Sequence, residues 1–161
     1  ASGATKCASC PAGQHGRKHS TFHCDSCGIG KTSLQGSTSC IECVPGTYAE
    51  TEGSVKCKQC EAGKYQGNMS GIICESCEAG TYSGSGNATC TACASGKYTA
   101  LTGSSKCQDC EAGYHPNGNR TVCEECSNSH HLYSEKGDTD CSYCDKYYFW
   151  YEDGCKKCPD G

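Results

Sequence analysis

The sequence predicts a small disulfide-rich fold: an elongated tandem array of irregular modules and short β-hairpins, with few or no helices. Cysteine accounts for 20 of the 161 residues, a proportion typical of disulfide scaffolds. The cysteines form Cys-x-x-Cys pairs that recur every 14 to 18 residues, and a short period is typical of solenoids and beaded arrays. Only ten residues are Val, Ile or Leu, so we expect cross-links to replace a conventional apolar core.

The repeat unit reads C-x-x-C-x-x-G-x-Y, then a polar loop, then Gly-Ser before the next C-x-x-C. The stretch from Cys43 to Cys60 shows it in full. Glycine tolerates positive φ, so we expect a tight turn at the Gly that follows most pairs by three residues; Ser129 and Tyr147 replace it in the last units. We expect the following Tyr to lie over a disulfide with its hydroxyl in water. Short alternating stretches such as 96–100 indicate hairpins or irregular ribbon.

Residues 1–43 are divergent N-terminal repeats, with His15 and Thr32 at the Tyr position. His15 also lies close in sequence to His19 and His23, and the last two are four residues apart. This spacing raises the possibility of a metal site. A solvated loop is favoured because no helix is expected to present these side chains on one face, so we predict no metal.

Residues 43–126 are the regular repeats, and they contain three Asn-x-Ser/Thr sequons at Asn68, Asn87 and Asn119. All three asparagines lie late in the variable loop of their repeat. Such loops are expected to face solvent, where a glycan can be accommodated. We therefore predict that all three carry N-linked glycans.

Residues 126–161 are divergent and aromatic-rich. The aromatic run comprises Tyr147, Tyr148, Phe149, Trp150 and Tyr151, and it includes the only Trp of the chain. Two interpretations remain open. The rings form a local core for a divergent unit, or they form a patch that docks a neighbouring subunit or partner.

Both ends of the sequence match parts of the repeat. Residues 2–7 resemble the close of a unit, and residues 158–161 resemble the start of one. We expect this chain to be a segment of a longer array. Cys7 and Cys158 would then pair with cysteines outside it.

Two disulfide pairings fit the cysteine spacing. In the ladder, the second Cys of one pair bonds the first Cys of the next. The ladder pairs are Cys10–Cys24, Cys27–Cys40, Cys43–Cys57, Cys60–Cys74, Cys77–Cys90, Cys93–Cys107, Cys110–Cys123, Cys126–Cys141 and Cys144–Cys155. In the alternative, pairs combine 1–3 and 2–4 into five closed modules. Near identity of successive units favours the ladder, but the sequence leaves both open.

Zinc is the rival chemistry, because two Cys-x-x-Cys pairs a dozen residues apart suit a tetrathiolate site. The uniform run of pairs and the sequons favour disulfides, which persist in oxidising compartments. No catalytic motif or cofactor site is recognised, so we predict neither an enzyme nor a cofactor. The net charge of −4, with charges interspersed, disfavours a nucleic-acid partner. No apolar run reaches membrane-spanning length, so we predict no membrane insertion by this segment.

The repeat C-x-x-C-x-x-G-x-Y…G-S-x-x-C-x-x-C resembles the cysteine-rich repeats of ephrin-receptor and growth-factor-receptor ectodomains. It is also similar to the single-disulfide modules of tumour-necrosis-factor receptors. Long tandem runs are similar to cysteine-rich surface proteins of protists and algae. The resemblance covers nearly the whole chain, best over 40–126. It implies a rod of small disulfide-stapled modules with little regular secondary structure.

From these observations we expect an extracellular or cell-surface structural protein. Its repeats would assemble, with neighbouring subunits, into a coat, a stalk or a filament such as a flagellar hair. The alternative is a receptor or adhesion ectodomain that binds a protein ligand, because modules of this kind serve both purposes.

Overall fold

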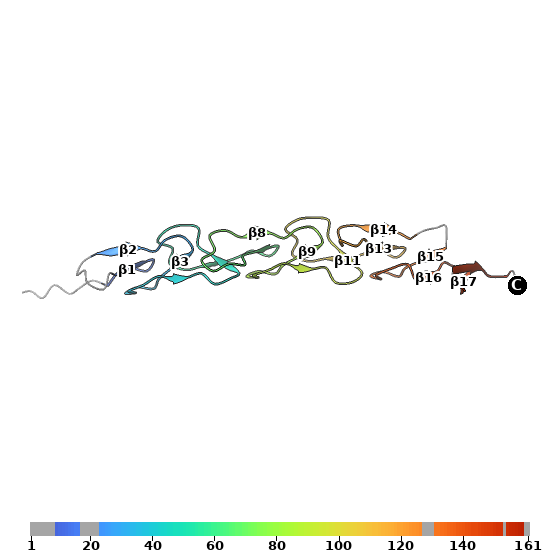
Figure 1. The fold of residues 1–161 in the computed structure, drawn as a ribbon, viewed down its shortest axis with the longest axis horizontal. Coiled ribbons are helices and arrows are strands. Elements are labelled where there is room, and N and C mark those ends of the chain that lie inside the picture. The colour runs from blue at the N-terminus through green and yellow to red at the C-terminus, as the bar shows by residue number, and fades with distance from the viewer. Residues whose placement is uncertain (1–8, 17–22, 127–130, 153, 160–161) are drawn as a thin grey trace, which may run out of the picture. The chain divides into compact units, whose positions relative to one another are not determined.

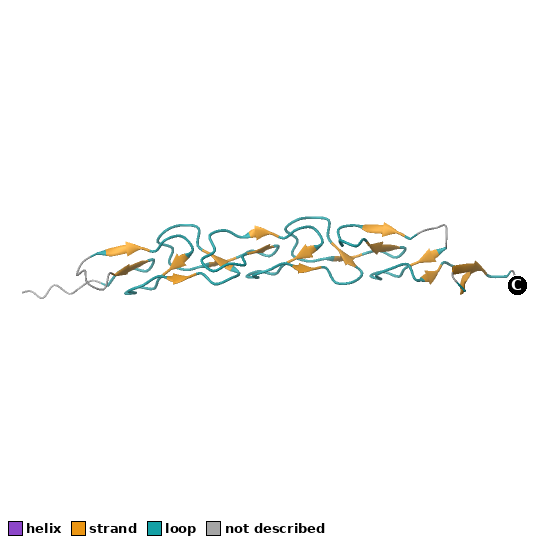
Figure 2. Cartoon of the chain, in the orientation of Figure 1, coloured by secondary structure: helices purple, strands orange, loops and turns teal. Residues whose placement is uncertain are grey.

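The computed structural model describes residues 9–16, 23–126, 131–152 and 154–159. They fall into two compact units, one within Ala1–Ser76 with Gly84–Thr89 and the other within Cys77–Ser83 with Cys90–Gly161. The regular structure of both units is short antiparallel hairpins, and the described residues contain no helix (Figure 2). This confirms the predicted class, a disulfide-rich chain of tandem hairpin modules.

Each hairpin pairs one strand with the strand that follows it in sequence (Figure 1). The strands of the first unit are β1 (Gln14–Gly16), β2 (Cys24–Ser26), β3 (Lys31–Thr32), β4 (Ile41–Glu42), β5 (Thr47–Tyr48), β6 (Lys58–Gln59), β7 (Lys64–Tyr65) and β8 (Glu75–Ser76). Those of the second are β9 (Thr81–Tyr82), β10 (Thr91–Ala92), β11 (Lys97–Tyr98), β12 (Gln108–Asp109), β13 (Tyr114–Pro116), β14 (Cys123–Glu125), β15 (Leu132–Tyr133), β16 (Tyr143–Cys144), β17 (Tyr148–Tyr151) and β18 (Gly154–Lys157). Hairpins this short are marginal alone, so other contacts must hold them.

Disulfides divide the described chain into loops, which we number modules 1 to 9 from Cys10–Cys24 to Cys144–Cys155. In a regular module the first strand begins directly after the repeat glycine, as β5 follows Gly46. The second strand lies between the two cysteines of the next pair, as β6 lies between Cys57 and Cys60. The hairpin therefore links the closing cysteine of one module to the opening cysteine of the next.

The repeat glycine is required for two separate reasons, which Gly46 illustrates. Its φ is +84°, the left-handed conformation that the sequence predicts. In addition, a Cβ added there would overlap the carbonyl oxygen of Gly86, two modules further along. Equivalent close approaches join Gly13 to Gly53, Gly30 to Ser70, Gly80 to Asn119 and Gly96 to Gly137. Within each unit, a module thus packs on its next-but-one neighbour through the backbone.

Adjacent modules are joined by a repeated set of main-chain hydrogen bonds. Between modules 2 and 3, Cys43 N donates to Gly30 O at 2.9 Å and Gly53 N donates to Cys27 O at 2.7 Å. Gly30 N also donates to Ala49 O at 2.8 Å. The corresponding bonds of the second unit include Cys93 to Gly80, Gly103 to Cys77 and Gly80 to Thr99. Because all of these groups are backbone, the interlock tolerates variation of the loop side chains.

The core of each unit is narrow and consists of sulfur, backbone and small side chains. The buried cysteines are the second members of their pairs: Cys10, Cys27, Cys43, Cys60, Cys77, Cys93, Cys110 and Cys126. A small residue directly after the Tyr position is also buried, as Ser33, Ala49, Ser83, Thr99 and Ser134 show. Ser33 Oγ donates to Gln14 O at 2.8 Å, which satisfies the buried hydroxyl. Sequence analysis did not identify this buried position.

Candidate functional site

The described cysteines are joined in the ladder arrangement. The bonds are Cys10–Cys24, Cys27–Cys40, Cys43–Cys57, Cys60–Cys74, Cys77–Cys90, Cys93–Cys107, Cys110–Cys123, Cys126–Cys141 and Cys144–Cys155. Their Cα–Cα distances are 5.5 to 5.7 Å, normal for disulfides. Cys158 is an exposed free thiol, and its N–H donates to Tyr147 O at 2.7 Å. Cys7 lies outside the described residues.

This arrangement leaves none of the ladder cysteines as a thiolate for zinc. Among the residues that the structure describes, no group of three or more His, Cys, Asp or Glu is placed to hold a metal ion. Of the three N-terminal histidines, His15 lies in β1, opposite Asp25 of β2. His23 Nε2 lies 3.6 Å from Asp25 Oδ1, whereas His19 is outside the described residues.

The three sequon asparagines, Asn68, Asn87 and Asn119, are all exposed. Each lies within three residues of a positive-φ residue late in its module, namely Ser70, Gly86 and Arg120. This part of the module closely approaches the repeat glycine two modules earlier. Asn68 N donates a hydrogen bond to Gln66 Oε1 at 2.9 Å. Solvent can therefore reach all three side chains. Their glycosylation stays a prediction.

The C-terminal aromatic cluster, residues 147–151, faces mainly outward. Tyr147 is 67% exposed and Trp150 57% exposed, and Phe149 and Tyr151 are also exposed. Only Tyr148 is half-buried, stacked on His131 with ring centroids 3.7 Å apart. The rings therefore do not form the local core that one interpretation expected, apart from Tyr148. Docking of a partner on this cluster stays a prediction.

Alternation along β17 distributes these rings over both faces of the hairpin β17–β18. Phe149 and Tyr151 share one face, in edge contact at 6.2 Å. Lys156 Nζ lies 3.9 Å from the centroid of the Tyr151 ring, a cation–π contact. Trp150 alternates to the opposite face. The hairpin β17–β18 therefore carries exposed aromatic rings on both of its faces.

Two hollows occur at equivalent positions of the repeat, and sequence analysis did not find them. The first has a volume of about 280 Å³ and is lined by Tyr48, Glu50, Glu61, Lys64, Ile73 and Cys74. The second, of about 310 Å³, is lined by Tyr98, Gln108, Asp109, Glu111, Tyr114, Val122 and Cys123. Each hollow is lined by the repeat Tyr of one module and by a Glu, an aliphatic side chain and a disulfide cysteine of the next module. The signal in the sequence is an Ile or Val directly before the first Cys of a pair.

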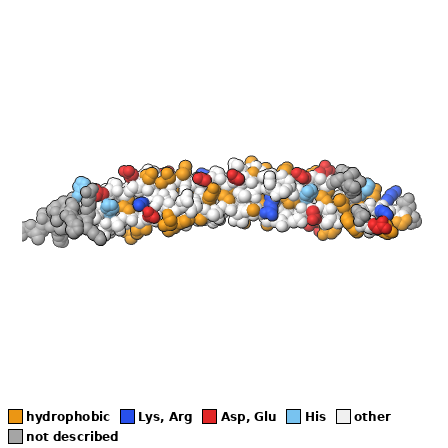
Figure 3. Space-filling view, viewed as in Figure 1, with side chains coloured by type: hydrophobic (Ala, Val, Ile, Leu, Met, Phe, Trp, Pro, Cys, Tyr) orange, Lys and Arg blue, Asp and Glu red, His pale blue; other side chains and the backbone are white. Residues whose placement is uncertain are grey.

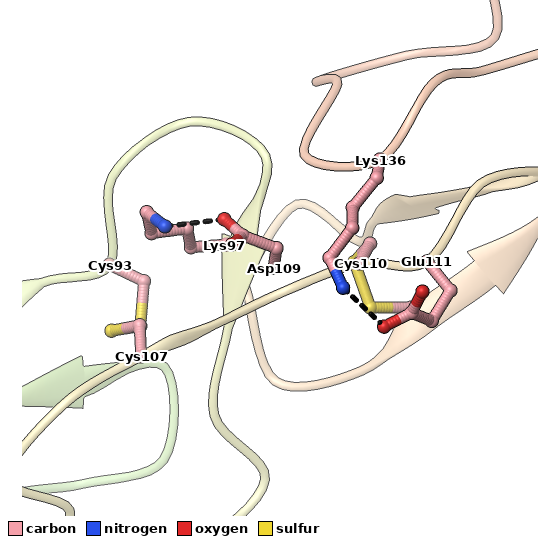
Figure 4. A network of polar contacts seen from close by, with 8 residues as sticks. Cys93, Lys97, Cys107, Asp109, Cys110, Glu111 and Lys136 are labelled. Atoms are coloured by element: carbon pink, nitrogen blue, oxygen red, sulfur yellow. Dashed lines mark hydrogen bonds and ion pairs between the residues drawn. A yellow bond between two sulfur atoms is a disulfide. The ribbon is translucent and has the colours of Figure 1, made fainter.

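Surface charges are paired locally. On the face shown in Figure 3, acidic and basic side chains are interspersed. Figure 4 shows Lys97 paired with Asp109, and Lys136 reaching from its loop to Glu111, with Nζ 2.9 Å from Oε1. The hydrogen bond to Glu111 raises the pKa of Lys136. Exposed pairs of this kind contribute little stability each.

The hydrogen bond from Lys31, supported by Ser70 and by the lysine charge, lowers the pKa of Glu42. Lys31 Nζ lies 3.2 Å from Glu42 Oε1, across the hairpin β3–β4. Glu50 likewise raises the pKa of Lys58 through a hydrogen bond and its charge. These shifts follow from surface ion pairs, so they indicate local structure rather than a catalytic group.

Comparison with known families finds a match on the repeats. Residues 30–68 and 80–115 match the family described as tyrosine-protein kinase ephrin type A/B receptor-like. Comparison with the curated proteins finds no match. The described part of the chain has no helix long and apolar enough to cross a membrane. The matched repeats are therefore similar to cysteine-rich, receptor-like modules, and this likeness together with the disulfides indicates an extracellular or surface location.

Proposed function

We propose that this chain, a tandem array of ephrin-receptor-like cysteine-rich modules, is part of an extracellular structural protein that assembles into a coat, a stalk or a filament. The observation that carries the proposal is the main-chain interlock between modules. It recurs from Gly30 and Ala49 in the first unit to Gly113 and Ser134 in the second. An interlock made of backbone can be extended by repetition, because each added module brings the same donors and acceptors.

The aromatic cluster supports assembly with a neighbouring subunit of the same protein. Tyr147 and Trp150 are more than half exposed, and large exposed aromatic side chains are the usual anchors of protein contacts. A contact between this cluster and a different surface of the next subunit is heterologous. Such contacts propagate into fibres when they do not close into a ring.

The test is electron microscopy of the native material at physiological salt, without reductant. Regular filaments or sheets are expected for the native chain, and Trp150→Ser should abolish them. The matched control is Leu101→Ser, which changes an exposed side chain of the second unit, 73% exposed, outside the cluster. Because Trp150 is the only Trp, its emission also reports burial directly. We expect a blue shift as the concentration rises through assembly.

Discrete particles at every concentration, with unchanged Trp emission, would contradict assembly. They would support the second candidate, a receptor or adhesion ectodomain that binds a protein ligand. The match of residues 30–68 and 80–115 to a receptor-like family favours this candidate. Its test is capture of cell-surface or secreted proteins by the immobilised chain, with a reduced and alkylated chain as control.

A further inference from the structure

The two hollows lie next to two of the three sequons. In module 4, the side-chain amide of Gln66 accepts from Asn68 N through Oε1 at 2.9 Å. The same amide donates through Nε2 to the carbonyl oxygen of Ile73, which lines the first hollow. One side-chain amide thus bridges the backbone N–H of the sequon asparagine and a backbone carbonyl in the wall of the hollow.

In module 7 the side chain and the backbone of Asn117 together link the sequon to the wall of the second hollow. Asn117 Oδ1 accepts from Thr121 N at 2.8 Å, and Thr121 is the third residue of the Asn119 sequon. Asn117 N donates to Val122 O at 3.0 Å, and Val122 lines the second hollow. The sequon turn is therefore tied to the hollow wall in both modules.

The linings suit a sugar residue. Tyr48 and Ile73 in the first hollow, and Tyr98 and Val122 in the second, offer apolar surface for the C–H face of a pyranose ring. Glu61 of the first hollow offers a carboxylate that accepts hydrogen bonds from a hydroxyl or an amide N–H. The volume of the second hollow, about 310 Å³, lies at the low end of the range for ligand sites, roughly 300–1,000 Å³, and that of the first, about 280 Å³, lies just below it.

We propose that the innermost N-acetylglucosamine residues of N-linked glycans on Asn68 and Asn119 pack into these two hollows. The inference rests on the proposed extracellular location. There, Asn Nδ2 loses a proton and forms a bond to C1 of a glycan carried by a lipid diphosphate. The bond between C1 and the diphosphate oxygen breaks, and the lipid diphosphate is the leaving group. A shallow open hollow holds a free sugar weakly, but a tethered sugar has an effective concentration in the millimolar range. Attachment next to the hollow therefore selects the chain's own glycan as the occupant.

Asn87 provides an internal comparison. Ala88 and Thr89 precede Cys90 in module 5, so no large aliphatic side chain stands where Ile73 and Val122 stand in the other modules. A glycan on Asn87 is expected to extend into solvent.

The experiment uses the full chain secreted from cells that add N-glycans, with each glycan trimmed enzymatically to one isotope-labelled N-acetylglucosamine. Two-dimensional NMR then reports each sugar separately. We expect upfield ring-current shifts, and nuclear Overhauser contacts from the Asn68 sugar to Tyr48 and Ile73. Tyr48→Ala should remove both. Tyr82→Ala, at the same repeat position before a module without a sequon, should leave them unchanged.

Ile73→Ser provides a second variant that keeps the Tyr and tests the other wall. Non-reduced mass and peptide mapping verify that each variant retains its disulfides. Sugar resonances at Asn68 and Asn119 that match those at Asn87 would overturn the proposal, as would sequons that carry no glycan in a correctly oxidised chain. Neither result depends on filament formation, so failure here is distinguishable from failure of the proposed assembly.

Discussion

The guanidinium group of Arg120 donates a hydrogen bond through Nη1 to the main-chain carbonyl oxygen of Cys93, 2.6 Å away. In regular modules the equivalent carbonyl accepts the backbone N–H of the turn residue, as Cys43 O accepts from Ser70 N at 2.8 Å. In module 7 the turn residue is Arg120 itself, with φ +57°, and its N–H donates to Asn117 O instead. The arginine side chain therefore supplies a contact that the backbone supplies elsewhere.

Replacing Arg120 should weaken the junction of modules 6 and 7. In Arg120→Ala the carbonyl of Cys93, a fully buried residue, loses this donor. An unsatisfied buried polar group costs about 1–3 kcal/mol, so the free energy of local opening should fall by that amount. Native-state hydrogen exchange of amides in residues 93–126 measures it. Lys106→Ala is the control, and equal protection in the two variants would show that the guanidinium contact contributes nothing.

Alanine at a repeat glycine should be far more damaging than alanine at a loop glycine. Gly46→Ala forces a side chain into φ +84° and against the carbonyl oxygen of Gly86. Strain and overpacking together should cost roughly 2–5 kcal/mol. Gly118→Ala, where a Cβ meets nothing within 4 Å, should change stability by less than about 0.5 kcal/mol. Denaturant unfolding with the disulfides intact compares the two. Similar midpoints would contradict the close packing of modules 3 and 5.

Proteolysis without reduction should release peptides linked in ladder order. Cys43 should be found joined to Cys57, and Cys60 joined to Cys74. The 1–3 and 2–4 pairing would instead join Cys40 to Cys57. Mass spectrometry before and after reduction decides between them. The double variant Cys43→Ser with Cys57→Ser should lose about 3 kcal/mol of stability, because the loop that this disulfide closes has a sequence separation of 14 residues.

The free energy of unfolding should decrease at low pH, because protonation of Glu42 weakens its ion pair with Lys31. The hydrogen bond from Lys31 lowers the pKa of Glu42 in the folded chain. A carboxyl with a depressed folded pKa stabilises the fold above its unfolded pKa, and this contribution is lost as the pH falls through the folded value. The contribution is small, since the pair is exposed and screened by salt. NMR titration of Glu42 should show its pKa rising in Lys31→Met. An unchanged titration would remove Lys31 as the cause.

Much of this fold can be predicted from short-range sequence features. A Cys-x-x-Cys pair every 14 to 18 residues determines the period, and glycine three residues after a pair determines the turn. A fold built from short loops is easier to predict from sequence, because each module contacts mainly its near neighbours and few pairings between distant segments have to be identified. The aromatic run at 147–151 was equally visible, but its surroundings were not. Whether those rings faced a core or solvent depended on neighbours such as His131, which stacks only on Tyr148.

The sequence by itself determined the module, its period, the presence of disulfides and the likeness to receptor-like repeats, because these depend on residue types at fixed spacing. The tertiary structure decided which cysteines pair, since both pairings satisfy the same spacing. It also decided that Gly46 faces Gly86 two modules on, and that Ile73 and Val122 complete hollows beside sequons. Those relationships depend on how far the chain advances between modules. That advance is set by main-chain hydrogen bonds between residues 19 to 27 positions apart, such as those of Gly30 with Ala49 and Cys43 with Ser70.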